Sequence, residues 1–179
     1  MSLRPRIRQR GVSMLEVLIA LVLLTTTLLG ATALQITGLQ TNRSGYYRTQ
    51  ASILAYDIAD RIRVNASYAL SDSSNYQFDT SSDAVPSSTS CITSSSGCSA
   101  ANLRAQDLRE WSENFQDISG IGHDGSNYKA VLPAGVGVIT TSGATFSVAI
   151  SWDEIDWNVG VSNKANTTKQ FTLDFTLAN

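Results

Sequence analysis

A single carboxylate, Glu16, stands at the beginning of an otherwise uncharged apolar run. Residues 17–34 carry no charged side chain, and these 18 residues would span about 27 Å as a helix, close to the ~30 Å hydrocarbon core of a bilayer. An acid at the edge of such a segment costs on the order of a few kcal/mol unless it is paired. We therefore expect Glu16 to have a function.

The residues before the apolar run are strongly basic. They contain no acid and four arginines, Arg4, Arg6, Arg8 and Arg10. The positive-inside rule predicts that residues 1–11 stay in the cytoplasm as a leader and that the rest of the chain is exported. If a protease cuts after Gly11, the new chain begins at Val12 with a free ammonium group. In an assembly of such helices, this ammonium could neutralise Glu16 of a neighbouring subunit inside the membrane.

The segment from Gly11 to Leu21, with Glu16 near its start, resembles the class III signal of type IV prepilins and pseudopilins. The resemblance implies that a membrane-bound prepilin peptidase cuts after Gly11 and methylates the amino group of Val12. It also implies that Glu16 is the carboxylate used in assembly. Val12 stands where the family most often has Phe.

Two other interpretations of the N-terminus remain open. An ordinary secretory signal peptide also has a basic start, and Ala31-Thr32-Ala33 fits its A-x-A cleavage pattern. A plain single-pass anchor explains the arginines and the apolar length but gives Glu16 no partner. The first residue of the mature protein separates the three: Val12, Leu34 or an uncut start.

Helical periodicity continues beyond the apolar run, and no proline occurs between Gly11 and Val85. Apolar residues recur at steps of three and four, which predicts one buried stripe: Tyr47, Ala51, Leu54, Ala55, Ile58 and Ile62. The sequence therefore predicts one helix from about Val12 to about Ala69, with residues 12–34 as the transmembrane and assembly half and residues 35–70 as the amphipathic half. Residues 71–179 form the globular periplasmic head. No helix-breaking proline occurs from Thr25 to Leu39. Within the pilin family this absence favours a low-copy subunit over the main filament protein.

A Ser/Thr-rich stretch, residues 71–99, reads as a long loop and contains both cysteines of the chain, Cys91 and Cys98. In an exported protein these two thiols are expected to form a disulfide. A metal site and free thiols are the alternatives. The two cysteines and the single, distant His123 do not make a tetrahedral zinc set, so no metal is expected.

The remainder predicts a short helix followed by a sheet. Ser99 is a plausible N-cap, and the helix is followed by a glycine-rich loop. Strand-like runs occur at 128–132, 136–141, 144–152 and 171–177, with Ser142-Gly143 as a hairpin turn. The predicted fold class is α+β, a long N-terminal helix packed on an antiparallel sheet of about four strands. This order matches the pilin fold.

Several segments resemble one branch of this superfamily, the minor pilins called type IV pilus modification protein PilV. They are residues 57–63, the Cys91/Cys98 pair followed by Asp107-Leu108, residues 132–135 and residues 148–153. The resemblance implies a minor pilin that helps initiate pilus assembly, at the tip with other minor pilins, and so supports pilus biogenesis and twitching motility. Its partners would be other minor pilins, the major pilin, prepilin peptidase, the lipid bilayer and the inner-membrane assembly platform. It would sit in the bacterial inner membrane before assembly and in the pilus afterwards.

Two further classes of function remain open. A minor pseudopilin of a type II secretion system has the same helix and signal, and an anchored or secreted enzyme is the third class. His123 beside Asp124 lacks a nucleophile-elbow pattern, so no enzyme is expected. Asp153, Glu154 and Asp156 lack the spacing of a calcium loop, and no cofactor is expected.

Charge argues against nucleic acid as a partner. The 13 basic residues less the four in the leader leave 9 against 15 acids, a net charge of −6. Phosphate binding requires a basic surface, so the exported chain is not expected to bind DNA or RNA.

Overall fold

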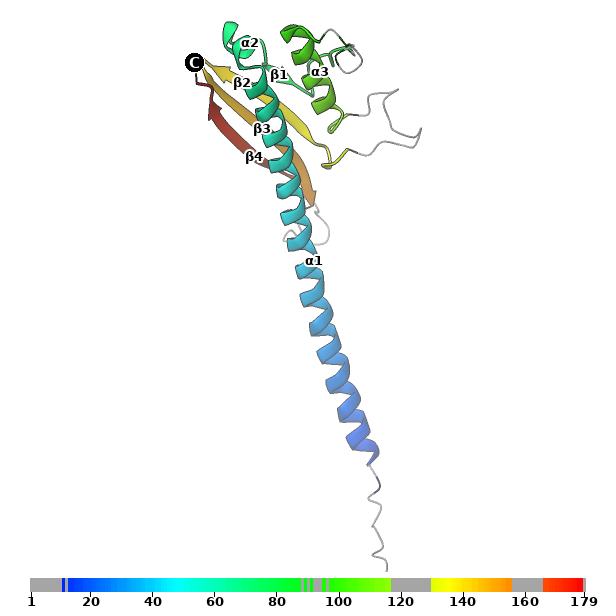
Figure 1. Ribbon diagram of the computed structural model, residues 1–179. Coiled ribbons are helices and arrows are strands. Elements are labelled where there is room, and N and C mark those ends of the chain that lie inside the picture. Colours follow the sequence, from blue (N-terminus) through cyan, green and yellow to red (C-terminus); the bar gives the residue numbers. More distant parts are fainter. Residues whose placement is uncertain are drawn as a thin grey trace, which may run out of the picture. The chain divides into compact units, whose positions relative to one another are not determined.

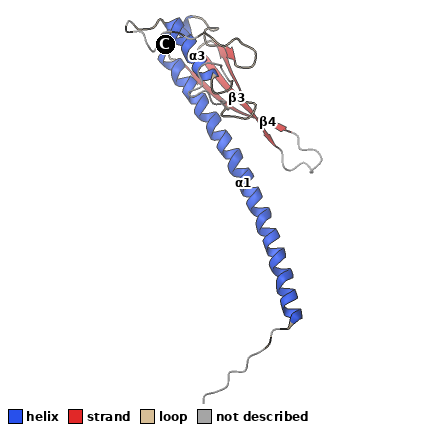
Figure 2. Ribbon diagram, turned by 90° about the vertical axis from the view of Figure 1, so that its right-hand side faces the viewer, coloured by secondary structure: helices blue, strands red, loops and turns tan. Residues whose placement is uncertain are grey.

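The computed structural model describes residues 11, 13–87, 89, 91, 95, 97–116, 130–155 and 166–178. The chain divides into two compact units, an N-terminal unit, Met1–Arg43, and a globular unit, Ser44–Asn179. Within the globular unit, helix lies on one face of an antiparallel sheet (Figures 1 and 2). The predicted α+β class, with a long helix and a four-stranded sheet, is confirmed.

The long helix, α1, covers Met14–Val64. Its start is fixed by Ser13, whose Oγ accepts from the Leu15 amide at 3.3 Å and whose carbonyl accepts from the Val17 amide at 3.2 Å. In the globular unit, α1 buries a stripe at helical spacing: Ala51, Leu54, Ala55, Ile58, Ala59 and Ile62. The amphipathic pattern predicted for this half is therefore present, because only one face of the helix meets the core.

The sequence predicts one unbroken helix to about Ala69, and this prediction is wrong. Helix α1 ends at Val64, and a second short helix, α2, covers Ala66–Ser71. Between them Asn65 is 8% exposed, and its side-chain amide donates to Tyr76 Oη at 3.0 Å and to the Ala100 carbonyl at 2.8 Å. These long-range hydrogen bonds account for the break, since no proline or glycine occurs there.

The sheet has the order β1-β2-β3-β4, with every neighbouring pair antiparallel. Its strands are β1 Phe78–Asp79, β2 Val136–Ser142, β3 Thr145–Ile155 and β4 Asn166–Thr176. The inward residues of β3 alternate along the strand and are buried: Phe146, Val148, Ile150 and Trp152. They contribute to one core with the α1 stripe.

Three details of the predicted sheet were wrong. Residues 130–132 are not a strand, while 128 and 129 lie outside the described residues. The first strand is instead β1, within the stretch expected to be a loop. The hairpin turn is Gly143-Ala144 rather than Ser142-Gly143, and Gly143 has φ +61, a backbone conformation that favours glycine. β3 and β4 also extend into the segment 153–169 that was expected to be a polar loop.

The helix predicted after Ser99 is α3, Ala100–Ser112, and Ser99 caps it by accepting from the Asn102 amide at 3.2 Å. Its Trp111 is fully buried and donates from Nε1 to the Leu54 carbonyl of α1 at 3.0 Å. The ring of Trp111 lies over Gly137 of β2, where a Cβ would meet Trp111 Cη2 at 2.5 Å and Phe115 Cζ at 2.9 Å. Only glycine fits at this position.

We predict that Gly137→Ala destabilises the protein by about 1–3 kcal/mol, because the methyl group must displace two buried aromatic rings. The matched control is Gly45→Ala, where nothing lies within 4 Å of the new Cβ and helix propensity favours alanine by about 0.5–1 kcal/mol. Denaturant unfolding of the full chain in detergent measures both. A stability for Gly137→Ala equal to that of the wild type would contradict this packing.

Candidate functional site

The N-terminal unit presents the residues singled out by the sequence. Gly11 is exposed and precedes α1, and Glu16 lies exposed in the first turn of that helix. Val12 and residues 1–10 lie outside the described residues. An acid in the first turn is favoured by the positive end of the helix dipole. Among the described residues, Glu16 makes no ion pair or side-chain hydrogen bond, so its charge is available to another chain.

The apolar run that follows Glu16 is not covered by the described part of the chain. Its large side chains are 49–71% exposed from Val17 to Leu29. By length and composition this helix could cross a membrane. The hydroxyl groups of threonines within it donate hydrogen bonds to main-chain carbonyls of the same helix. Thr26 donates to the Val22 carbonyl at 3.0 Å, and Thr27 donates to the Leu23 carbonyl at 2.9 Å. The polar groups are thus satisfied internally, which an apolar surrounding requires.

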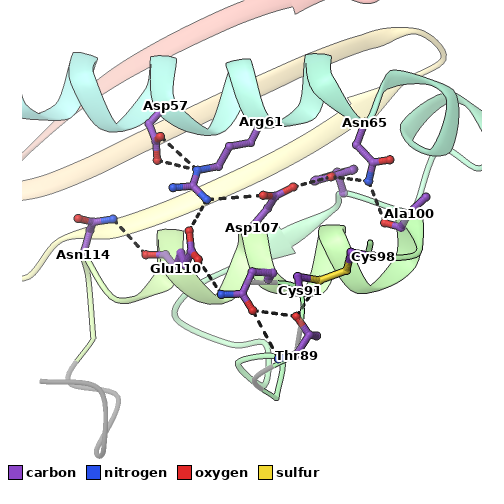
Figure 3. Close-up of polar contacts among 12 residues, drawn as sticks. Asp57, Arg61, Asn65, Thr89, Cys91, Cys98, Ala100, Asp107, Glu110 and Asn114 are labelled. Atoms are coloured by element: carbon purple, nitrogen blue, oxygen red, sulfur yellow. Dashed lines mark hydrogen bonds and ion pairs between the residues drawn. A yellow bond between two sulfur atoms is a disulfide. The ribbon is translucent and has the colours of Figure 1, made fainter. Parts of the chain in front are cut away.

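The globular unit contains a second polar arrangement, centred on Arg61 of α1 (Figure 3). Its guanidinium meets three carboxylates: Glu110 at 2.5 Å, Asp57 at 3.1 Å and Asp107 at 3.5 Å. Asp107 and Glu110 both come from α3, so this arginine joins the two helices. Burial disfavours the charge of Arg61, but its bonds to Glu110 and Asp57 outweigh burial and raise its pKa.

The pKa values of the two α3 carboxylates, Asp107 and Glu110, shift in opposite directions. Burial raises the pKa of Asp107, and the hydrogen bond from Tyr76 and the more distant Arg61 do not offset it. Burial also acts on Glu110, but hydrogen bonds from Gln106 and Arg61 outweigh it and lower that pKa. The nearest carboxylate therefore gains most from Arg61, whereas Asp107 relies on Tyr76 Oη, which donates to it at 3.0 Å.

Cys91 and Cys98 form a disulfide, as the sequence indicated. The segment beside it is attached to α3 (Figure 3), because Thr89 Oγ1 donates to Gln106 Oε1 at 2.8 Å. Gln106 Nε2 in turn donates to Glu110 Oε1 at 2.6 Å. A chain of polar contacts thus runs from the disulfide region to Arg61.

Of the other residues considered from the sequence, Asp153 and Glu154 lie within the described ranges and make local contacts. Asp153 Oδ1 accepts from Thr168 Oγ1 at 2.9 Å, and Glu154 Oε1 accepts from Trp152 Nε1 at 2.7 Å. Asp156, His123 and Asp124 lie outside the described residues. Within the described ranges, no cluster of three or more His, Cys, Asp or Glu side chains could hold a metal ion.

Of the Arg61 arrangement, only the Asp57–Arg61 pair can be found from the sequence. Their spacing of four along one helix is a local signal. Asp107, Glu110 and Tyr76 come from segments distant in the sequence, and no local pattern indicates that they meet Arg61.

Comparison with protein families agrees with the geometry of the N-terminal unit. Residues 6–32 match the prokaryotic N-terminal methylation motif, and residues 33–109 match the family of type IV pilin Tt1218. No curated protein and no solved structure matches the chain. The two adjoining family matches support a type IV pilin. It is thus a structural subunit and not an enzyme, and it assembles with other pilins after processing by prepilin peptidase.

The two α3 carboxylates predict opposite dependences of stability on pH. A raised folded pKa means that Asp107 contributes stability below its ordinary value of 3.8 and loses it as the pH rises through the folded value. The lowered pKa of Glu110 means that its contribution is present above 4.5 and is lost as the pH falls. Asp107→Asn should therefore gain stability relative to the wild type as the pH rises, and Glu110→Gln should gain as it falls. Urea unfolding across the acid range measures both, and slopes of the same sign would contradict the assignment.

Proposed function

We propose that this pilin is a minor pilin of a type IV pilus, of the PilV branch, that helps to initiate assembly with other minor pilins at the pilus tip. The observation that carries the proposal is Glu16, which lies five residues after Gly11 in the first turn of an exposed apolar helix and has no ion pair within the described ranges. This segment lies inside the matched methylation motif.

The chemistry of assembly follows from these groups. Prepilin peptidase cuts after Gly11, removes residues 1–11 and methylates Val12, which leaves a cationic amine at the new terminus. Residues 12–34 then lie in the inner membrane, with the globular unit in the periplasm. The amine of one subunit meets Glu16 of its neighbour, and the pair removes the cost of a lone carboxylate in lipid.

The placement among minor pilins rests on sequence. The α1 helix has no proline between Met14 and Val64, and the Cys91–Cys98 disulfide, Asp107-Leu108 and residues 148–153 follow the pattern of the PilV branch. Initiation of assembly, and with it twitching motility, is the role that this branch implies.

A minor pseudopilin of a type II secretion system is the second candidate, because the methylation motif and the apolar helix serve both machines. Deletion of the gene separates them. A pilus role predicts few pili and loss of twitching with normal enzyme secretion. A pseudopilin role predicts loss of secretion with pili at normal numbers, and this outcome would refute the first proposal.

We predict that Glu16→Gln is inserted in the membrane as well as the wild type but enters pili at least about tenfold less, because glutamine cannot pair with the neighbour's amine. Immunoblots of sheared pili and of membrane fractions measure both quantities. Asp174→Asn, the same charge change on the exposed part of β4, is the control and should leave incorporation unchanged. Equal incorporation of Glu16→Gln and wild type would refute the electrostatic role.

A second prediction concerns processing. Gly11→Leu should keep the leader attached, because a bulky side chain at the residue before the cut no longer fits a site shaped for glycine. Gly11 is exposed and nothing lies within 4 Å of a Cβ there, so the change leaves the fold intact. Intact mass spectrometry of the membrane form measures it. A mature chain that still begins at Val12 would show that Gly11 does not direct the cut.

A further inference from the structure

A groove with a volume of about 640 Å³ lies between α1 and α3 in the globular unit. Apolar surface comes from Ile53 and Leu54 of α1, and charged groups come from both helices: Asp57, Arg61, Arg109, Glu110 and Glu113. Ile53 is 54% exposed, and Tyr56, one turn further along α1, is 51% exposed. Ile53 therefore exposes apolar surface within the groove, and Tyr56 exposes more on α1 outside the groove lining.

The charges that line the groove do not balance. Its three acids, Asp57, Glu110 and Glu113, outnumber its two arginines. Arg61 also forms an ion pair with Asp107, which does not line the groove. Arg109 donates from Nη1 to the Pro86 carbonyl at 2.9 Å, and among the described residues its buried Nε has no acceptor. The groove is therefore acidic and retains an unused donor.

Among the charged groups that line the groove, Glu113 is the one whose charge is least favoured by its position in the folded chain. It follows the last residue of α3 as its C-cap, at the negative end of the helix dipole, where an acid is disfavoured. It is partly buried, and among the described residues its carboxylate has no hydrogen bond or ion pair. Burial raises its pKa, the nearby Arg109 offsets this only in part, and Glu110 adds to the rise. A cation from another molecule would relieve all of these costs.

We propose that this groove docks a basic segment of another pilin subunit, with a lysine or arginine of that segment on Glu113 and Asp57 and an apolar side chain on Ile53. The proposal rests on the assembly function described above, since pilins are the partners with which this chain assembles. Main-chain amides of such a segment supply both acceptors for Arg109 and donors for the carboxylates. The excess of acids in the groove selects a basic segment over an acidic one.

This role predicts that stability and docking respond in opposite directions to one substitution. Glu113→Gln removes a charge that the folded chain disfavours, so the variant should unfold at the same or a higher denaturant concentration than the wild type. A residue kept for folding would lower stability when changed. Docking should nevertheless weaken, because the partner's cation loses its counter-charge.

The test uses the full chain in cells, with Tyr56→p-benzoylphenylalanine as a photo-crosslinker at the edge of the groove and Thr172→p-benzoylphenylalanine, on exposed β4, as the background. We expect a crosslink at Tyr56 to a pilin subunit, identified by mass spectrometry. Glu113→Lys should lower its yield at least about tenfold and Glu113→Gln several-fold. Asp174→Lys, the same charge reversal outside the groove, should leave the yield unchanged.

The outcomes separate this proposal from the assembly role. No crosslink to a pilin above the Thr172 background, or a yield that Glu113→Lys does not lower, would overturn docking at the groove. A lower stability of Glu113→Gln would assign Glu113 to folding and also overturn it. Incorporation of Glu16→Gln into pili is measured in the same cells. If that variant is excluded from pili while the crosslink is absent, the assembly role stands and the groove proposal fails.

Discussion

The structure depends on a single constraint: a charge in an apolar surrounding must be paired. Glu16 begins an uncharged helix of large exposed side chains, and no ion pair for it exists within the described part of the chain. Two family matches place this helix in a type IV pilin, which assembles with other subunits. Among the described residues the fold leaves this carboxylate exposed and without an ion pair, which is what the proposed pairing with a neighbouring subunit requires.

The globular unit solves the same electrostatic problem internally. Arg61, Asp57 and Glu110 bring opposite charges within 2.5–3.1 Å, and Asp107 receives a hydrogen bond from buried Tyr76. Because removing one partner of a partly buried pair strands the other charge, these contacts fix α3 against α1. The Thr89–Gln106 contact beside the disulfide extends the arrangement to a segment with little apolar surface of its own.

The local pattern of the chain was sufficient for most of the long helix, the α3 cap at Ser99, most of β3 and the second half of β4, because periodicity and capping are local signals. It was insufficient for β1, which has two residues and exists through its pairing with Val138 and Ile139 of β2. It was equally insufficient for the end of α1, which depends on hydrogen bonds from Asn65 to segments far along the chain. For the Arg61 arrangement, the sequence indicates only the contact with Asp57, because Asp57 is the one carboxylate of the three that lies on the same helix as Arg61.

Comparison of the acids shows which ones folding accounts for. Glu110 is held by Gln106 and Arg61, and Asp107 by Tyr76, so their positions follow from the contact of α3 with α1. Glu113 follows them on the same helix and gains nothing from that contact. Since an acid at a helix C-terminus is unfavourable, a chain selected for stability alone would place a basic or neutral residue there. Glu16 differs in this respect, because it lies at the favourable end of its helix, but like Glu113 it has no ion pair among the described residues. In the roles proposed for them, each acid would receive its cation from a second subunit.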